Sequence, residues 1–191
     1  VDEAHNLVER ARAMYSGALE QAALRAVRRR SQGPLRRALD RLNRHWNDLQ
    51  RDVEAPYTVF DELPAGFAEA LRAAAAELAE ALADPALAAD AEWQTFAFDV
   101  LHVAGLVESF GPHSLFDLTR TPALASAADL APDRSPTRRP RADRSVLCVR
   151  NLVPAPHLQS RWAAARASVL FSATLTPRDY HADLLGLPSD A

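Results

Sequence analysis

Residues 145–171 read SVLCVRNLVPAPHLQSRWAAARASVLF. Two short apolar runs containing β-branched residues, 145–150 and 168–171, flank a stretch of helical composition at 158–167. A helix between two strands is typical of a crossover connection, which parallel neighbours in a sheet require. This segment therefore predicts an α/β fold with parallel strands for the last part of the chain.

The middle of the chain has a helical rather than a strand-like periodicity. Apolar residues recur there at spacings of three and four, which predicts amphipathic helices. The three seams are Leu35, Leu39, Leu42, Trp46, Leu49 and Val53; Phe67, Leu71, Ala74, Leu78 and Leu82; and Trp93, Phe96, Val100, Val103, Val107 and Phe110. Their short connections predict an all-α bundle. Core packing is the preferred role for the two tryptophans of these seams, and stacking on nucleic-acid bases is the alternative.

Changes in composition divide the chain into four parts. We expect an α/β segment at 1–30, an all-α insertion at 31–118 and a second α/β segment at 145–191. The residues between them, 119–144, are rich in proline and arginine and poor in large apolar side chains, so we expect a mobile loop.

The composition excludes several classes of function for these 191 residues. All 22 basic Lys+Arg positions are arginine, and the absence of lysine excludes a complete P-loop nucleotide site and lysine-based covalent catalysis. The single cysteine, Cys148, forms no internal disulfide, and no apolar run has the length of a membrane span. We therefore expect a cytoplasmic protein without a membrane partner. Because the chain begins at Val1 and not at methionine, we also expect a piece of a longer chain.

The first residues, Val1-Asp2-Glu3-Ala4-His5-Asn6, carry two adjacent carboxylates at the end of a short apolar start. This arrangement is typical of a Walker B site, in which the first carboxylate binds a phosphate-bound Mg²⁺ and the second orients or deprotonates the attacking water. The alternative is that Asp2 and Glu3 only supply negative charge to the first turn of a helix.

A second candidate site, Ser172-Ala173-Thr174, directly follows the apolar run 168–171. Hydroxyl residues at the carboxyl edge of a parallel sheet lie where α/β folds bind their ligands. The alternative is an ordinary turn between a strand and a helix, in which serine and threonine act as caps.

Taken together, Asp-Glu-Ala-His followed by Ser-Ala-Thr resembles motifs II and III of superfamily-two helicases. The strings VDEAHNLVERARAMYSGAL and VLFSATLTPRDYHADLLGLP are similar to the corresponding stretches of the DinG/XPD group of ATP-dependent DNA helicases, and of its bacterial DinG-like members especially. In that group a helical insertion called the arch separates the two motifs within the first RecA-like domain. The resemblance covers both ends of the chain closely and the middle by architecture alone.

The resemblance implies a partial RecA-like motor domain, formed by 1–30 and 145–191, with an arch insertion between its parts. It implies that Asp2 and Glu3 bind Mg²⁺, that Glu3 and His5 are catalytic, and that Ser172, Ala173 and Thr174 couple the nucleotide state to strand separation. The cofactor would be ATP with Mg²⁺. The chain would be inactive alone, because the phosphate-binding loop and the second motor domain lie outside these residues.

The resemblance also implies 5′-to-3′ movement on single-stranded DNA in repair or replication. Members of the family often carry a 4Fe–4S cluster, and its cysteines precede motif II. Its other motor domain, single-stranded DNA and ATP are the implied partners. Candidate DNA contacts come from the arginine-rich first third of the chain, and the alternative is a solvated face paired with nearby carboxylates. These candidates are Arg28, Arg29, Arg30, Arg36, Arg37 and Arg41. A rival hypothesis is an autonomous helical DNA-binding or scaffold module without ATPase activity.

Overall fold

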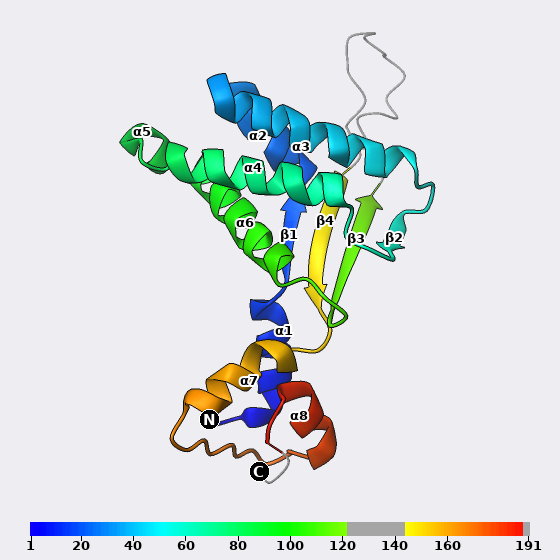
Figure 1. Ribbon diagram of the computed structural model, residues 1–191, viewed down its shortest axis with the longest axis vertical. Helices are drawn as coiled ribbons and strands as arrows, with labels where there is room; N and C mark the ends of the chain where they lie inside the picture. Colours follow the sequence, from blue (N-terminus) through cyan, green and yellow to red (C-terminus); the bar gives the residue numbers. More distant parts are fainter. Residues whose placement is uncertain (122–143, 189–191) are drawn as a thin grey trace, which may run out of the picture.

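The computed structural model describes residues 1–121 and 144–188, and the chain forms a mixed α/β structure. Figure 1 shows a large unit, in which helices cover a sheet, above a small helical unit that contains both termini. The chain leaves the small unit once, before the first strand, and returns to it after the last strand. The large unit is therefore inserted into the small one.

The sheet of the large unit has four strands, β1 (Gly17–Glu20), β2 (Tyr57–Phe60), β3 (Ser114–Thr121) and β4 (Arg144–Asn151), in the order β1-β4-β3-β2. Every neighbouring pair is antiparallel. Residues 145–150 thus form the predicted strand, but the prediction that it has parallel neighbours is wrong. The reason is that β3 and β4 align as a hairpin, with Thr121 opposite Arg144, and antiparallel neighbours need no helical crossover.

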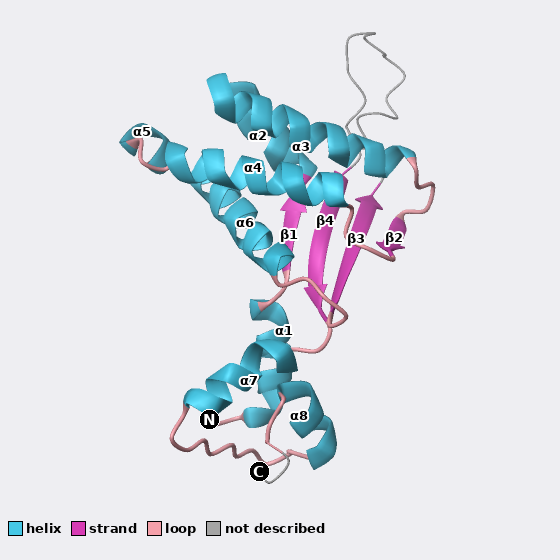
Figure 2. Cartoon of the chain, viewed as in Figure 1, coloured by secondary structure: helices cyan, strands magenta, loops and turns pink. Residues whose placement is uncertain are grey.

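The helices of the large unit are α2 (Gln21–Arg30), α3 (Gly33–Arg51), α4 (Ala65–Ala81), α5 (Pro85–Ala88) and α6 (Ala91–Glu108). Figure 2 shows them gathered along one side of the sheet. Their buried apolar side chains meet those of β1, β3 and β4 in one core. The three helices predicted from apolar periodicity are confirmed as α3, α4 and α6.

The expectation that residues 31–118 are all helical is wrong, because β2 and most of β3 fall inside this range. The sequence pattern predicted neither strand, because β2 has only four residues and β3 contains a charged residue at its centre. The expected loop at 119–144 lies mostly outside the described residues. Its first three residues belong to β3 and its last residue begins β4.

Both seam tryptophans are in the core. Trp46 is fully buried, packs edge-on against Phe67, and donates its indole N–H to the Ser145 hydroxyl at 2.8 Å. Trp93 is also buried, on α6. The core-packing prediction is confirmed for both.

The small unit contains the short 3₁₀ helix η1 (Ala4–Asn6) and the helices α1 (Leu7–Met14), α7 (Ala155–Ala164) and α8 (Arg178–Leu185). The segment 168–171, predicted as a strand, has no regular strand assignment. Within 1–121 and 144–188, no helix is both long and apolar enough to cross a membrane.

Candidate functional site

The two end segments that carry the candidate motifs lie side by side in the small unit. The Val1 amino group donates to the Val169 carbonyl at 2.6 Å, and the Phe171 N–H donates to the Val1 carbonyl at 3.2 Å. The Ala4 N–H in turn donates to the Phe171 carbonyl at 3.2 Å. The first two of these bonds follow the pattern of parallel neighbours, whereas the third comes from Ala4 and not from Glu3, so the pattern stops after one residue and the segments do not form a strand pair.

The two carboxylates follow immediately after this contact. Asp2 and Glu3 are both exposed, and the Asp2 carboxylate accepts the Glu3 N–H at 2.8 Å. Glu3 has a φ of 51°, in the left-handed region, which is uncommon for a residue other than glycine. This turn ends the extended start of the chain and begins η1, so the two carboxylates stand together where the chain reverses.

His5 links the two candidate motifs. Its Nδ1 atom lies 2.7 Å from the Ser172 hydroxyl oxygen and 3.1 Å from a Glu3 carboxylate oxygen. The imidazole is about one-third exposed, so it joins a carboxylate at the surface to a serine in the neighbouring segment. The tautomer of His5 decides whether Nδ1 donates to these oxygens or accepts the serine proton.

The Ser172-Ala173-Thr174 segment forms a tight turn. The Ser172 hydroxyl accepts the Thr174 N–H at 3.4 Å, which is the hydrogen bond of a serine turn, while also contacting His5. Ala173 and Thr174 are exposed. Ser172 does not cap a helix, because α8 begins at Arg178 with Pro177 as its N-cap and has no side-chain cap; its hydroxyl takes part in this local turn and in the contact with His5.

The residues available for a metal are few. Mg²⁺ usually takes one or two carboxylates together with substrate phosphates and water, so Asp2 and Glu3 are a suitable donor set for a phosphate-bound Mg²⁺. Across the described ranges, no group of three or more histidine, cysteine or acidic side chains is arranged to hold a metal by itself. Cys148 is buried in β4, and burial raises the pKa of its thiol to about 11.

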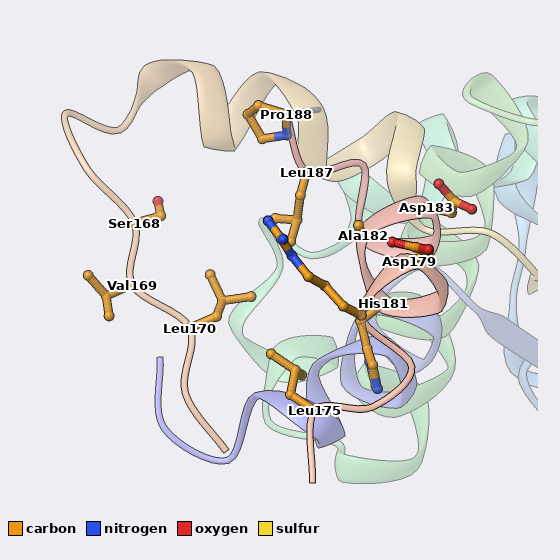
Figure 3. Close-up of a pocket in the computed structure, with 11 residues that line it drawn as sticks. Ser168, Val169, Leu170, Leu175, Asp179, His181, Ala182, Asp183, Leu187 and Pro188 are labelled. Atoms are coloured by element: carbon orange, nitrogen blue, oxygen red, sulfur yellow. The ribbon is translucent and has the colours of Figure 1, made fainter. Parts of the chain in front are cut away.

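A cavity of about 780 Å³ lies between the segment after α7 and helix α8. Figure 3 shows Val169 and Leu170 on one side and His181 on the other. The His181 side chain is buried, with a relative exposure of 8%. Among the described residues, its Nδ1 atom has no hydrogen-bond partner. Sequence reasoning assigned His181 no role, because an isolated histidine in an amphipathic helix gives no signal of its own.

Two apolar side chains of the same segment are exposed. Val169 is 69% exposed and Phe171 is 56% exposed, although both belong to a run whose composition is typical of a buried strand. Segment 168–171 is therefore covered by Val1 on one side, while its other sides face the cavity or are exposed. The small unit is thus less completely packed than the large unit.

The six arginines proposed as DNA contacts divide into two groups. Three of them are paired with carboxylates: Arg28 lies 3.5 Å and Arg36 lies 3.1 Å from Asp40, and Arg30 contacts Asp90. The other three are exposed and form no ion pair with a residue that the structure describes. These are Arg29, Arg37 and Arg41.

The structure does not bring these arginines to the paired motifs. They lie on α2 and α3 of the large unit, whereas residues 1–6 and 168–174 belong to the small unit at the other end of the molecule (Figure 1). On α3, Arg37 and Arg41 are one turn apart and face Glu77 of α4 across a shallow cavity. This carboxylate weakens the positive field of that part of the surface.

The junction between the two units was not identified from the sequence. Tyr15 and His157 stack with their ring centroids 4.1 Å apart, and His113 meets the edge of His157 at 4.8 Å. Burial and the neighbouring His113 lower the pKa of His157. The Ser16 hydroxyl accepts the Asn151 N–H at 2.9 Å, which ties the two connections between the units together.

Comparison of the chain with protein-family models and with curated proteins gives no match.

Proposed function

We propose that this chain is the part of a DinG-like ATP-dependent DNA helicase that runs from motif II to motif III and includes the arch insertion. The observation that carries the proposal is the 2.7 Å contact between His5 Nδ1 and the Ser172 hydroxyl. These residues belong to two short motifs that are 167 positions apart, and each motif alone has an ordinary explanation. Two unrelated turns would have no reason to share a side-chain contact, whereas paired helicase motifs would.

The parallel contact of Val1 with residues 169–171 supports the same proposal. RecA-like domains present their catalytic residues where parallel strands end, at the carboxyl edge of the sheet. Asp2 and Ser172 each follow one of these two neighbouring segments directly. The exposed Val169 and Phe171 side chains are the surface that the rest of a motor domain would cover.

In this proposal, each residue of the paired motifs has its own task. Asp2 binds Mg²⁺, Glu3 orients the attacking water and accepts its proton, and His5 connects Glu3 to Ser172. Bound ATP and Mg²⁺ supply the phosphoanhydride and the charge that stabilises its cleavage. A displacement of Glu3 alters the His5 contacts and hence the Ser172-Ala173-Thr174 turn, which couples nucleotide state to movement on DNA.

The remaining functional assignments follow the family resemblance. Single-stranded DNA, ATP and the rest of the motor are the proposed partners, with 5′-to-3′ movement and a cytoplasmic location. An iron–sulfur cluster, if the parent chain carries one, would be bound by residues other than Cys148, which is buried with a pKa of about 11. The absence of lysine means that other parts of the parent must bind the nucleotide phosphates.

The parent reading frame provides the first test. It should encode G-x-x-x-x-G-K-[ST] upstream of Val1, and a parent chain without such a loop would rule the proposal out. In the parent protein, Glu3→Gln should lower the ATPase rate at least about a hundredfold, because it removes a general base. Glu9→Gln is the matched control, since Glu9 is an exposed carboxylate on α1 that pairs with Arg12. The isolated 191-residue chain should hydrolyse no ATP.

One observation favours a second candidate function, an autonomous DNA-binding or scaffold module. The buried residues of the main core all lie between Leu19 and Val149, within the large unit. If this unit is the functional entity, single-stranded DNA binding should depend on the unpaired Arg29, Arg37 and Arg41 and should weaken with salt. A Glu3→Gln substitution would then change neither binding nor any activity of the parent, which separates the two candidates.

A further inference from the structure

A second polar cavity lies in the large unit, at the end of the sheet away from the small unit. It has a volume of about 220 Å³ and is lined by Gln21, Arg25, Gln50, Arg120 and Ser145. The first residue of α2, the start of β4 and the C-terminal part of α3 all contribute to its walls. Every lining residue that the structure describes is polar, and none of these five is acidic.

The two arginines of this cavity carry charge that no described carboxylate neutralises. Arg120 donates through its Nη atoms to the carbonyls of Gln50, Glu54 and Ala55, at 3.4, 2.5 and 3.3 Å. Its Nε atom is buried and has no hydrogen-bond partner among the residues that the structure describes. Arg25 makes one long hydrogen bond, 3.5 Å, to Asn47. Within 1–121 and 144–188, neither guanidinium forms an ion pair.

The neutral residues around the arginines are held in place by a hydrogen-bond network. Ser145 accepts hydrogen bonds from Trp46 and Gln50, which leaves its own hydroxyl hydrogen free to donate. The Gln21 side chain, which is buried, donates to Asn47 at 2.8 Å and accepts from Gln50 at 3.0 Å. The donors are therefore fixed before any ligand arrives.

The N-terminus of α2 adds to the positive potential. Gln21 is its first residue and no acidic residue lies in its first turn; the N-cap residue is Glu20, whose carboxylate makes no cap and contacts Arg144 instead. A helix N-terminus presents unpaired N–H groups and the positive end of the macrodipole. Arg25 belongs to the first turns of α2 itself and Arg120 belongs to β3, and both guanidiniums line the same cavity.

We propose that this cavity binds a phosphate group. Arginine guanidiniums present forked donors that match phosphate oxygens, and a serine hydroxyl beside a helix N-terminus is a common supplementary donor. The absence of acidic lining residues disfavours a cation. The volume corresponds to about seven water molecules at liquid density, which suits one phosphate group with a few waters and does not suit a nucleoside as well. Free phosphate and a phosphate of a nucleic-acid strand share this chemistry.

Calorimetric titration of the 191-residue chain with inorganic phosphate tests the site. We expect saturable binding that sulfate competes for and chloride does not. Arg25→Gln should weaken the binding about tenfold, the usual effect of removing one charge-assisted hydrogen bond. Arg44→Gln is the matched control, because Arg44 is an exposed arginine on α3 of the same unit and does not line the cavity. Its affinity for phosphate should equal that of the wild type.

A second variant guards against loss of structure. Arg25→Lys keeps the charge and loses the forked pair of donors, so it should bind phosphate with an affinity between those of the wild type and Arg25→Gln, at an unchanged melting temperature.

An oligothymidylate without terminal phosphates distinguishes the two sources of phosphate. Competition with inorganic phosphate assigns the site to a DNA phosphodiester, and failure to compete assigns it to a free or terminal phosphate. Absence of phosphate binding at millimolar concentration, or equal binding by wild type and Arg25→Gln, would overturn the proposal.

Discussion

At the scale of single residues, His5 has the most informative position in the chain. His5 belongs to the first motif, and its imidazole touches Glu3 of the same motif and Ser172 of the second, so it connects the two motifs in the structure. The candidate residues were found from the sequence because each motif is short and local. Their contact was not derivable from spacing, since it depends on how the chain folds between position 5 and position 172.

The His5–Ser172 contact gives the first residue-scale prediction. Ser172→Ala should lower the free energy of unfolding by about 1 kcal/mol, the typical net contribution of a partly buried hydrogen bond. Urea denaturation measures this change. Thr174→Ala is the control, because the Thr174 side chain is exposed and equally close to the turn. In a double-mutant cycle, His5→Ala and Ser172→Ala should be non-additive; strictly additive effects would show that the contact contributes nothing.

At the scale of elements, the helices were predictable and the sheet was not. The seams of α3, α4 and α6 repeat within a few residues, and local periodicity reports a buried helical face. Strand pairing is non-local: the run at 145–150 gave a strand, but nothing in it shows that β1 and β3 would be its antiparallel partners. The composition of β3 also misleads, since a strand centre with an aspartate does not resemble a core strand.

The aspartate in β3 leads to an element-scale prediction. Asp117 is fully buried, and Arg150 of the adjacent strand β4 donates to its carboxylate. Arg150→Ala should lower the free energy of unfolding by about 2 kcal/mol, because it leaves a buried carboxylate without its partner; the exposure of Arg150 keeps this below the cost of breaking a fully buried pair. Arg144→Ala, which removes an exposed pair with Glu20 at the start of the same strand, should cost at most about 1 kcal/mol. Equal costs in chemical denaturation would contradict the special role of Asp117.

At the scale of the whole molecule, the large unit is an insertion into the small one. The chain crosses between them at two places, before β1 and after β4, and these crossings are joined by the Ser16–Asn151 hydrogen bond and the Tyr15–His157 stack. At the first crossing, Gly17 lies so close to α6 that an added Cβ would be 2.9 Å from His102 and Val103. The units therefore meet through a narrow, closely packed junction. Movement of one unit relative to the other would have to bend or break it.

The junction predicts a dependence of stability on pH. Burial and His113 lower the pKa of His157, so between its folded pKa and its usual value of about 6.5 the unfolded chain binds more protons than the folded chain. Stability should therefore fall as the pH drops through this range. Melting temperatures measured from about pH 8 to about pH 5.5 test this. His157→Phe keeps a ring against Tyr15 and removes the titration, so its melting temperature should change less over this range; an identical pH profile would exclude His157 as the cause.

The location of the core leads to the last prediction, that residues 17–151 fold without the small unit. All buried residues of the main core lie between Leu19 and Val149, and the two ends of this segment meet in the sheet, where Gly17 pairs with Val149. The fully buried core and the pairing of the first and last strands are thus contained in the segment, although Tyr15 packs against the edge of the core. The isolated segment should show cooperative thermal unfolding and the slow amide exchange of a packed core, and it should retain phosphate binding if the Arg25–Arg120 cavity is a site.

The complementary residues should not fold when expressed alone, because the small unit exposes Val169 and Phe171 and has few fully buried apolar side chains. A segment 17–151 that unfolds without cooperativity would mean that the small unit stabilises the sheet through the junction.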